Sequence, residues 1–578
     1  MAESKNGTET AAAKPARRFF PAGLPGTIAG FLGRHPRSIL TLLCLVLWLP
    51  GIVSLPGLDR DESRFAQSSR QMLETGNYVD IRLGQVPRYK KPVGIYWLQS
   101  ATTAAAAPFV GTQQIWTYRL ASLLGAILAV WLTVWCARSL LTPEASFLAG
   151  ALMAGTLILT AEAGIATTDA VLLACSTAMM GVVLRLYHAA RNEEAPRPGT
   201  GLVLAGWAAL ALGILIKGPV APGLLAVTLI GLCAWDREFK WLARFQPALG
   251  VPLLLAIVLP WLIAIALASD GAFFQQSLGN DFAAKLAGGQ ESHGALPGYY
   301  LLLSAVTLWP AILFIPPALA AAVPRHREPL IRFLLVWVAG WWLLVEVVPT
   351  KLPHYFISAA PALAILAAAW ITGLVSSSLW QKIAAWIAGI QFLIGAAGLV
   401  AALVLLPRLY GSGDITWLWG VAAVGAILAL TTLALFAGGK RGWAAVTAVI
   451  AGLVLFPAIT AGAGPHLDRL WMTRRLAAQT IAHVQAGDPP PVLAGYDEPS
   501  MLFALGANLG LSDGKGAADI AARNGGLALI EDAERGPFLA RLAEQQADAT
   551  ALETVHGFNY SRGRDVAVTI YRVGRLSN

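Results

Sequence analysis

The apolar run SILTLLCLVLWLPGIVSL at residues 38–55 is followed almost directly by LDRDESRFAQSSRQMLETGNYVDIRLGQVPRYKKPVGIYWLQ at residues 58–99. The first run approaches the roughly 20 apolar residues needed to cross a bilayer. The second stretch is charged: acidic residues open it and a basic cluster closes it. Because similar apolar runs make up most of the chain, we expect the chemistry to lie on this polar loop.

Composition indicates an integral membrane protein. The chain has 578 residues, of which 56% are hydrophobic and 13% charged, against about 25% charged residues in soluble domains. The net charge of +9 is explained by basic residues on cytoplasmic loops under the positive-inside rule, so no nucleic-acid partner is predicted. The four cysteines lie inside apolar runs without CxxC spacing, which supports neither a disulfide framework nor a zinc site.

Hydropathy predicts an all-α polytopic domain at 38–463, after a basic cytoplasmic tail at 1–37. The first loop, 56–115, then lies outside, and each loop predicted to be inside carries a basic residue. We expect thirteen spans, with the first apolar run retained as an anchor, at roughly 38–55, 116–139, 144–161, 166–189, 201–216, 219–235, 248–268, 298–321, 330–348, 355–375, 380–406, 415–437 and 443–463.

The last part of the chain, 464–578, has no spanning run. Its pattern predicts strands at PVLAGY, LALIED and DVAVTIYRV, with helices near 498–506 and 536–546. Alternating strands and helices indicate a small α/β domain, which follows an odd number of spans and is therefore expected outside.

Basic residues also occur on the predicted outer loops, against the usual charge bias. They lie in short strings: RYKKPVGIYW with Lys91, IKGPV with Lys217, the loop around Lys285, and PTKLPHY with Lys351. Each residue alone fits interfacial anchoring by a snorkelling side chain. Their recurrence favours binding of an anion such as a phosphate leaving group, which needs several positive donors.

Asp61 is the leading candidate for an acid–base residue. Asp59 and Glu62 have the D-x-x-E spacing of a helix capping box, which leaves Asp61 without a structural role. A partly dehydrated carboxylate can act as a general base. Asp169, in ATTDAV, falls at the outer end of its span, where an acid near a helix N-terminus is also electrostatically stable.

Metal binding has little support in the sequence. His293 lies beside Glu291 in ESHGALPGYY and is a weak candidate ligand, more readily explained as a solvated loop residue. No HExxH spacing and no Walker A pattern is present. A divalent metal is therefore one option, and no other cofactor is predicted.

Taken in order, these motifs resemble the bacterial polyprenyl-phosphate-dependent glycosyltransferases of the GT-C class. LDRDESRFAQSSRQML followed by RYKKPVGIYWLQ is similar to the first outer loop of the family that includes the protein O-mannosyltransferases and the lipid A aminoarabinose transferase. TTDAV, IKGPV, HGALPGYY, TKLPHY and an outer C-terminal domain extend the resemblance over most of the chain.

The resemblance implies roles for individual residues. Asp61 takes the place of the catalytic aspartate, Glu62 follows it, and Asp169 matches the second aspartate. The residues implied to bind the donor phosphate are Arg64, Lys91, Lys351, Tyr355 and, in less certain register, Lys285. Lys90 departs from the family pattern, which has a glutamate there that helps to hold a metal, so the departure argues against a metal shared with His293 and bears on the identity of the sugar.

The function implied is transfer of a sugar from a polyprenyl-phosphate donor to a lipid-anchored glycan, lipid A or lipopolysaccharide core. The enzyme would be a multi-pass protein of the bacterial inner membrane, surrounded by membrane lipids, with its active site facing the periplasm. Two alternatives stay open: a protein acceptor with the same donor class, and a lipid-linked sugar transporter without transfer chemistry.

Overall fold

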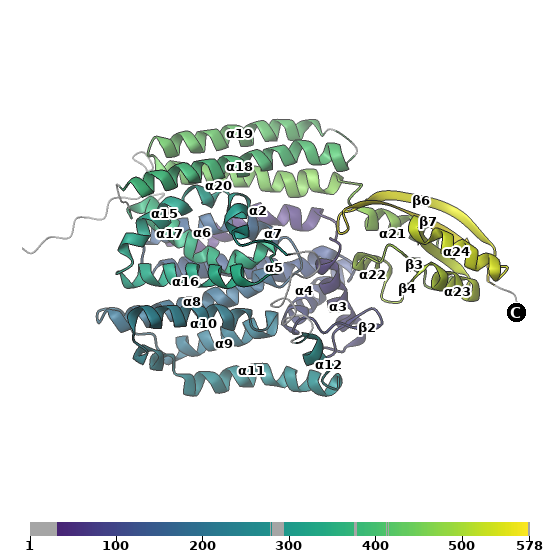
Figure 1. The fold of residues 1–578 in the computed structure, drawn as a ribbon, viewed down its shortest axis with the longest axis horizontal. Coiled ribbons are helices and arrows are strands. Elements are labelled where there is room, and N and C mark those ends of the chain that lie inside the picture. The colour runs from purple at the N-terminus through teal and green to yellow at the C-terminus, as the bar shows by residue number, and fades with distance from the viewer. Residues whose placement is uncertain are drawn as a thin grey trace, which may run out of the picture.

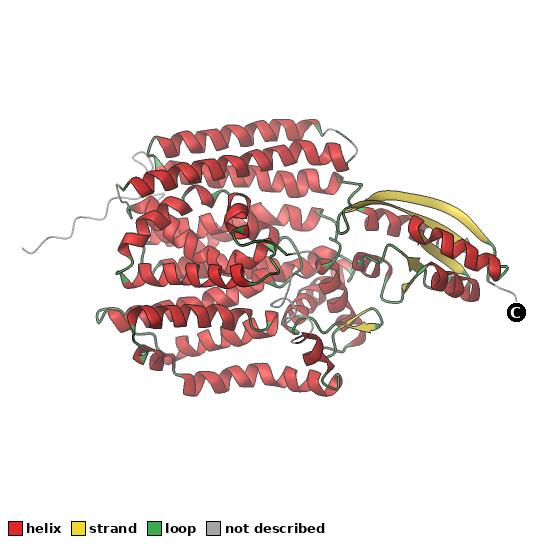
Figure 2. Ribbon diagram, in the orientation of Figure 1, coloured by secondary structure: helices red, strands yellow, loops and turns green. Residues whose placement is uncertain are grey.

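The computed structural model describes residues 32–277, 279, 294–374, 378–411, 413 and 415–575. A bundle of long apolar helices fills most of the molecule, and a small mixed sheet with its helices is attached at one end (Figures 1 and 2). The protein is therefore a polytopic α-helical membrane protein with a C-terminal α/β region, as the sequence predicts.

All thirteen predicted spans are helical, although not all are long and straight. Within the described residues, ten helices are long and apolar enough to cross a membrane, or up to twelve if two bent pairs each count as one span. The bent pairs are α6–α7 (Pro143–Ala154 and Leu157–Ala163) and α14 (Tyr299–Thr307) with Ala311–Arg325. The remaining predicted span is α10 (Val220–Asp236), which has only 17 residues, so the count of thirteen includes one short helix.

The other helices of the bundle follow the predicted runs closely. They are α2 (Pro36–Ser54), α5 (Ile115–Ala137), α8 (Asp169–Arg191), α9 (Thr200–Lys217), α11 (Pro247–Ala268), α15 (Ile315–Ala322), α16 (Pro329–Val347), α17 (Ala360–Thr372), α18 (Leu379–Tyr410), α19 (Thr416–Ala437) and α20 (Arg441–Pro457). The most buried of these spans are α8 and the Pro353–Thr372 span that ends in α17. The loops that precede these two helices, at the end of the bundle that carries the sheet, contribute to the cavity described below.

The first loop folds into two helices and a hairpin. These are α3 (Asp61–Thr75), β1 (Arg82–Leu83), β2 (Val86–Pro87) and α4 (Gly94–Val110). Phe65 and Met72 of α3 are buried, and so are all the residues between them, so protein surrounds this part of the helix on every face. Gly76 ends α3 with φ of +69°, a left-handed conformation that glycine adopts without steric cost.

The C-terminal region contains the predicted strands and helices. They are β3 (Val492–Ala494), α22 (Pro499–Leu505), β5 (Gly526–Glu531), α24 (Asp532–Glu544) and β7 (Arg564–Val573). The elements without a prediction are α21 (Met472–His483), β4 (Gly510–Ser512), α23 (Gly514–Asn524) and β6 (Ala549–Asn559). The strand order is β4-β3-β5-β7-β6, parallel in its first three strands and antiparallel in the rest.

This C-terminal region is docked on the first loop. The guanidinium of Arg70 in α3 donates to the carbonyl oxygen of Phe503 at 3.1 Å, and Arg60 donates to the carbonyl oxygen of Ser561 at 2.6 Å. The C-terminal region and the first loop therefore lie at the same end of the bundle, as Figure 1 shows. The prediction that they share one side of the membrane agrees with this arrangement.

Candidate active site

A cavity of about 320 Å³ lies at the end of the bundle that carries the first loop. Its wall combines segments that are far apart in the sequence: the start of α3, the loop after β2, the segment before α8, the end of α9 and the turn before α17. The charged and hydroxyl-bearing residues that line it are Asp59, Arg60, Asp61, Glu62, Arg64, Arg88, Lys90, Lys91, Glu162, Thr167, Thr168, Asp169, Lys217, Thr350, His354 and Tyr355.

Asp61 is the first residue of α3 and opens into this cavity. Its side chain is 66% exposed, and one carboxylate oxygen lies 3.2 Å from Nη1 of Arg64, one helical turn further on. The cavity walls partly shield the Asp61 carboxylate from water, which raises its pKa, but the positive charges of Arg88 and Arg64 outweigh that effect and hold the pKa below its usual value. Asp61 is therefore an anion at neutral pH, suited to orienting a hydroxyl and to taking its proton late in bond formation.

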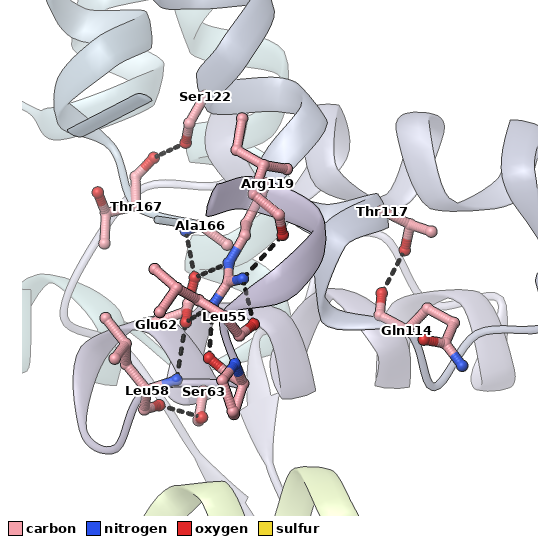
Figure 3. A network of polar contacts seen from close by, with 12 residues as sticks. Leu55, Leu58, Glu62, Ser63, Gln114, Thr117, Arg119, Ser122, Ala166 and Thr167 are labelled. Atoms are coloured by element: carbon pink, nitrogen blue, oxygen red, sulfur yellow. Dashed lines mark hydrogen bonds and ion pairs between the residues drawn. The ribbon is translucent and has the colours of Figure 1, made fainter. Parts of the chain in front are cut away.

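Glu62, the next residue, points the opposite way. It forms an ion pair with Arg119 of α5 in which the two side chains are 1% and 0% exposed. Figure 3 shows its carboxylate held by Arg119 and by the backbone N–H groups of Leu58 and Ala166, each at 2.8 Å from an oxygen. Because its contacts with Arg119 and Ala166 tie the first loop to the bundle, this geometry favours a structural role over the predicted catalytic one.

Arg119 completes that junction. Besides Glu62, its guanidinium donates to the carbonyl oxygens of Ile52, Leu55 and Pro56 at 2.7 to 2.9 Å. These carbonyls belong to the C-terminal end of α2 and the residues after it, where a helix leaves backbone oxygens without partners. One buried arginine therefore sets the position at which the first loop leaves the membrane domain.

Asp169 is the first residue of α8 and also faces the cavity. Both of its carboxylate oxygens accept hydrogen bonds from Nζ of Lys217 at 2.7 Å, so the IKGPV and TTDAV motifs meet in a nearly buried ion pair. His354 lies between two carboxylates: its ring nitrogens are 3.7 Å from Glu162 and 3.9 Å from Asp169. The Thr167 hydroxyl donates to Glu162 at 3.0 Å.

The residues after β2 add three cations to the cavity wall: Arg88, Lys90 and Lys91. Tyr355 also lines the cavity, with its ring centroid 5.5 Å from Nζ of Lys217. The structure therefore brings Arg64, Lys91 and Tyr355, all predicted to bind the donor phosphate, into one cavity with Asp61 and Asp169.

Lys351 is placed differently from this group. Its side chain is buried, and Nζ donates to the carbonyl oxygens of Glu346 and Val348 at 2.7 and 2.8 Å. A lysine that binds the last carbonyls of a helix stabilises the helix end, here that of α16. Lys351 does not line the cavity, so its predicted contact with a phosphate has no support in this geometry.

Lys285 and His293 lie outside the described residues, so the structure does not place these two predicted ligands. Among the residues that the structure does describe, no group of three or more His, Cys, Asp or Glu side chains could hold a metal ion. The position next to Lys91 is the cationic Lys90, which does not suit a cation site. A divalent metal that uses His293 stays a prediction, and no step below depends on it.

The capping-box interpretation of Asp59 is wrong. The N-cap of α3 is Arg60, with φ of +63° and no side-chain cap, because Asp59 turns away toward the C-terminal region. Its carboxylate accepts hydrogen bonds from the hydroxyls of Thr473, at 3.2 Å, and Ser500. Burial, with the nearby Glu498 adding to it, raises the pKa of Asp59 to about 6 although these hydroxyl contacts oppose the shift.

Sequence reasoning did not select Glu162, Arg88 or His354 as site residues. Glu162 has a detectable signal, since an acid at the end of an apolar run marks a functional position by default. Arg88 and His354 have no such signal in the sequence, because each stands among other charged or aromatic residues. Only the packing shows which of these residues face the cavity.

Comparison with known proteins agrees with this description. A family model described as dolichyl-phosphate-mannose-protein mannosyltransferase matches residues 39–269. The undecaprenyl phosphate-alpha-4-amino-4-deoxy-L-arabinose arabinosyl transferase 2 of Pseudomonas fluorescens (strain Pf0-1) is 28% identical over 325 residues, which is 55% of each protein. The corresponding transferase of Pectobacterium carotovorum subsp. carotovorum (strain PC1) is 26% identical over 452 residues, covering 75% of this chain and 76% of the relative.

The fold is also found in solved structures. The crystal structure of ArnT from Cupriavidus metallidurans bound to undecaprenyl phosphate superposes with a TM-score of 0.71 at 20% identity, covering 92% of this chain and 97% of that one. The apo structure of the same protein has a TM-score of 0.71 at 19% identity and covers 94% and 98%. At such identities the likeness concerns the fold.

The helix bundle and these matches make the chain similar to polyprenyl-phosphate-dependent membrane glycosyltransferases, with the fold of ArnT. The likeness to the dolichyl-phosphate-mannose-protein mannosyltransferases lies in residues 39–269, and the likeness to the aminoarabinose transferases extends over up to 75% of the chain.

Proposed function

We propose that this enzyme transfers a sugar from a polyprenyl-phosphate donor to a lipid-anchored glycan, lipid A or lipopolysaccharide core, on the periplasmic face of the bacterial inner membrane. The observation that carries the proposal is the cavity itself. Asp61, Lys91, Asp169 and Tyr355 come from four separate segments and line one space at an end of the helix bundle. The names of the aminoarabinose transferases similar to this chain support the donor class.

The proposed reaction uses Asp61 to orient the acceptor. The acceptor hydroxyl oxygen attacks the anomeric carbon from the face opposite the phosphate, so the configuration inverts. The bond between that carbon and the phosphate oxygen breaks, and its electron pair leaves with the phosphate. The hydroxyl proton, which becomes more acidic as the new C–O bond forms, passes to Asp61. The lowered pKa of Asp61 suits this late transfer, since it keeps the side chain ionised beforehand.

The departing phosphate needs positive charge, and Lys91 and Arg64 supply it in this proposal. Preorganised cations stabilise charge that develops in a transition state without the cost of reorganising solvent. Lys285 stays a predicted contributor outside the described residues. Asp169 and Lys217 form an ion pair in the wall of the same cavity, which we propose positions the acceptor, with Glu162 and His354 beside it.

The periplasmic side is inferred from charge and connectivity. A site at the membrane boundary lets the polyprenyl chain stay among the helices while its phosphate enters the cavity. The C-terminal region lies at the same end of the bundle as the first loop, whose residues line the cavity, and the basic residues of the opposite loops favour the cytoplasm.

The test uses the purified full-length protein with an undecaprenyl-phosphate-linked sugar and lipid A or lipopolysaccharide core in detergent. Release of undecaprenyl phosphate together with a mass increase of the acceptor is the expected result. Asp61→Asn should reduce turnover by at least about 1,000-fold, since it removes both the anion and the proton acceptor, and should leave the apparent melting temperature unchanged.

Asp565→Asn is a matched control. Asp565 is also an exposed aspartate paired with an arginine, Arg469 at 2.7 Å, but it lies on β7, outside the cavity. Full activity of Asp61→Asn would remove this residue from the mechanism. Transfer to a protein and not to the glycolipid would assign the alternative acceptor, and wild-type protein that released no undecaprenyl phosphate from any donor would favour a transporter.

A further inference from the structure

Arg88 is the most deeply buried of the three cations contributed by the residues after β2. It is 8% exposed, yet it lines the cavity. Its backbone N–H donates to the carbonyl oxygen of Ile81 at 2.7 Å, which ties the residue to the β1–β2 hairpin. Its guanidinium carbon lies 5.2 Å from the ring centroid of Phe65, so an aromatic side chain of α3 holds the charged group from one side.

Within the described part of the chain, this guanidinium has no carboxylate partner at ion-pair distance, and its Nε donates no hydrogen bond. Tyr96 lies beside it, close enough for the charge to act on the hydroxyl, but that hydroxyl also makes no bond of hydrogen-bond geometry. Arginine cannot lose its charge in a protein, and burying an unpaired charge is costly. A buried arginine without an acidic partner is therefore expected where its charge binds a ligand.

The acids around the cavity do not meet this need. Asp61, whose charge is felt by Arg88, is already in contact with Arg64. Asp169 is bound through both oxygens by Lys217. A ligand that brings its own negative charge would satisfy Arg88 without breaking either pair.

We propose that Arg88 is an oxyanion receptor for the sugar donor, which rests on the function proposed above. A guanidinium offers parallel N–H groups that match two oxygens of a phosphate or a carboxylate. The oxyanion is either the donor's phosphate or a carboxylate carried by the transferred sugar. In both cases Arg88 selects donors by charge and geometry, in addition to the point charges of Lys90 and Lys91.

If Arg88 binds the donor, its substitution should have an effect that substitution of a structural arginine would not have. Arg88→Met keeps an unbranched side chain against Phe65 and removes an unpaired buried charge, so the apparent melting temperature of the ligand-free protein should not fall. The increase in melting temperature caused by bound donor should shrink. If Arg88 had only a structural role, Arg88→Met would lower the melting temperature of the ligand-free protein and would leave the increase caused by bound donor unchanged.

The experiment measures binding of undecaprenyl phosphate and of its glucosyl and glucuronyl derivatives to the purified full-length protein. Arg88→Met is compared with Arg82→Met, which removes an arginine of the same hairpin that is 43% exposed and paired with Asp80. Arg88→Lys, which keeps the charge but loses the paired N–H groups, serves if Arg88→Met does not fold. We expect at least about a tenfold loss of affinity in Arg88→Met, a smaller loss in Arg88→Lys, and none in Arg82→Met.

The three lipids separate the two sources of the oxyanion. Weaker binding of all three by Arg88→Met would assign the phosphate, and weaker binding of the glucuronyl lipid alone would assign a sugar carboxylate. Unchanged affinity for all three, with wild-type protein binding them, would overturn the inference and leave the proposed function intact. Wild-type protein that bound none of them would overturn both.

Discussion

Substitution of Glu62 by Gln tests whether this residue is structural. The change removes the charge opposite Arg119 and places an amide N–H2 group where an oxygen now accepts two hydrogen bonds. Breaking a buried ion pair by removing one partner costs about 3 to 5 kcal/mol, and both side chains here are at most 1% exposed. Arg119 would keep its three backbone carbonyls but would lose its counter-charge.

A double-mutant cycle measures the coupling within this pair. Arg119→Met alone should also destabilise the protein, because it releases the carbonyls at the end of α2. The double variant should be more stable than the sum of the two effects predicts, by about 1 to 3 kcal/mol, since it leaves no uncompensated charge.

The assay is thermal unfolding in detergent, followed by tryptophan fluorescence and by retention of the monodisperse peak, next to turnover with the lipid-linked donor. For Glu62→Gln we expect a fall in apparent melting temperature of about 5 °C or more, with residual turnover below that temperature. Asp61→Asn, one residue away, should show the opposite: normal melting and no turnover. Glu62→Gln that melted like wild type yet lost turnover would refute the structural assignment and restore the catalytic one.

Three further predictions concern the charges around the cavity. The pKa of Asp59 is raised to about 6, so the stability that protonated Asp59 contributes is present at low pH and is lost as the pH rises through about 6. Asp59→Asn should remove that pH dependence and should melt at a higher temperature than wild type at pH 8. A wild-type melting temperature that increased as the pH rose through 6 would contradict this prediction. Arg64→Gln should raise the pKa of Asp61, since Arg64 helps to lower it, and should move the acidic limb of the kcat/KM profile to higher pH; an unmoved limb would mean that Asp61 does not control it. Lys217→Met should destabilise the protein by about 3 to 5 kcal/mol, because it leaves Asp169 buried beside Glu162, and Lys217→Met/Asp169→Asn should recover part of that loss; no recovery would show that the pair is not coupled.

Much of the fold could be predicted from the sequence, for a physical reason. A bilayer accepts only segments that satisfy their own backbone hydrogen bonds, so long apolar runs must be helices. In the C-terminal region, LALIED and DVAVTIYRV are rich in β-branched and apolar residues and contribute to the adjacent strands β5 and β7. The short strand β4 and helix α23 have weaker patterns and were not predicted.

The predicted site residues also differ in whether a local sequence pattern is enough to identify their role. Asp61 and Lys91 stand in motifs, and the structure places both at the cavity. Glu62 carries the same charge as Asp61 and adjoins it, yet the helical rotation of one residue turns it into the bundle toward Arg119. Its partner lies 57 positions further along the chain, which no local pattern encodes.

The sequence by itself determined that this chain is a membrane-spanning helix bundle with charged loop motifs and an α/β tail, because hydropathy and residue type act locally. Only the tertiary structure decided which charges pair and which stay available. Lys217 meets Asp169, Arg119 meets Glu62, and Lys351 is bound to carbonyls at the end of α16, while Arg88 enters the cavity without an ion pair to any described residue. Those outcomes depend on distances between helices far apart in the chain, and a buried charge is governed by its neighbours in space.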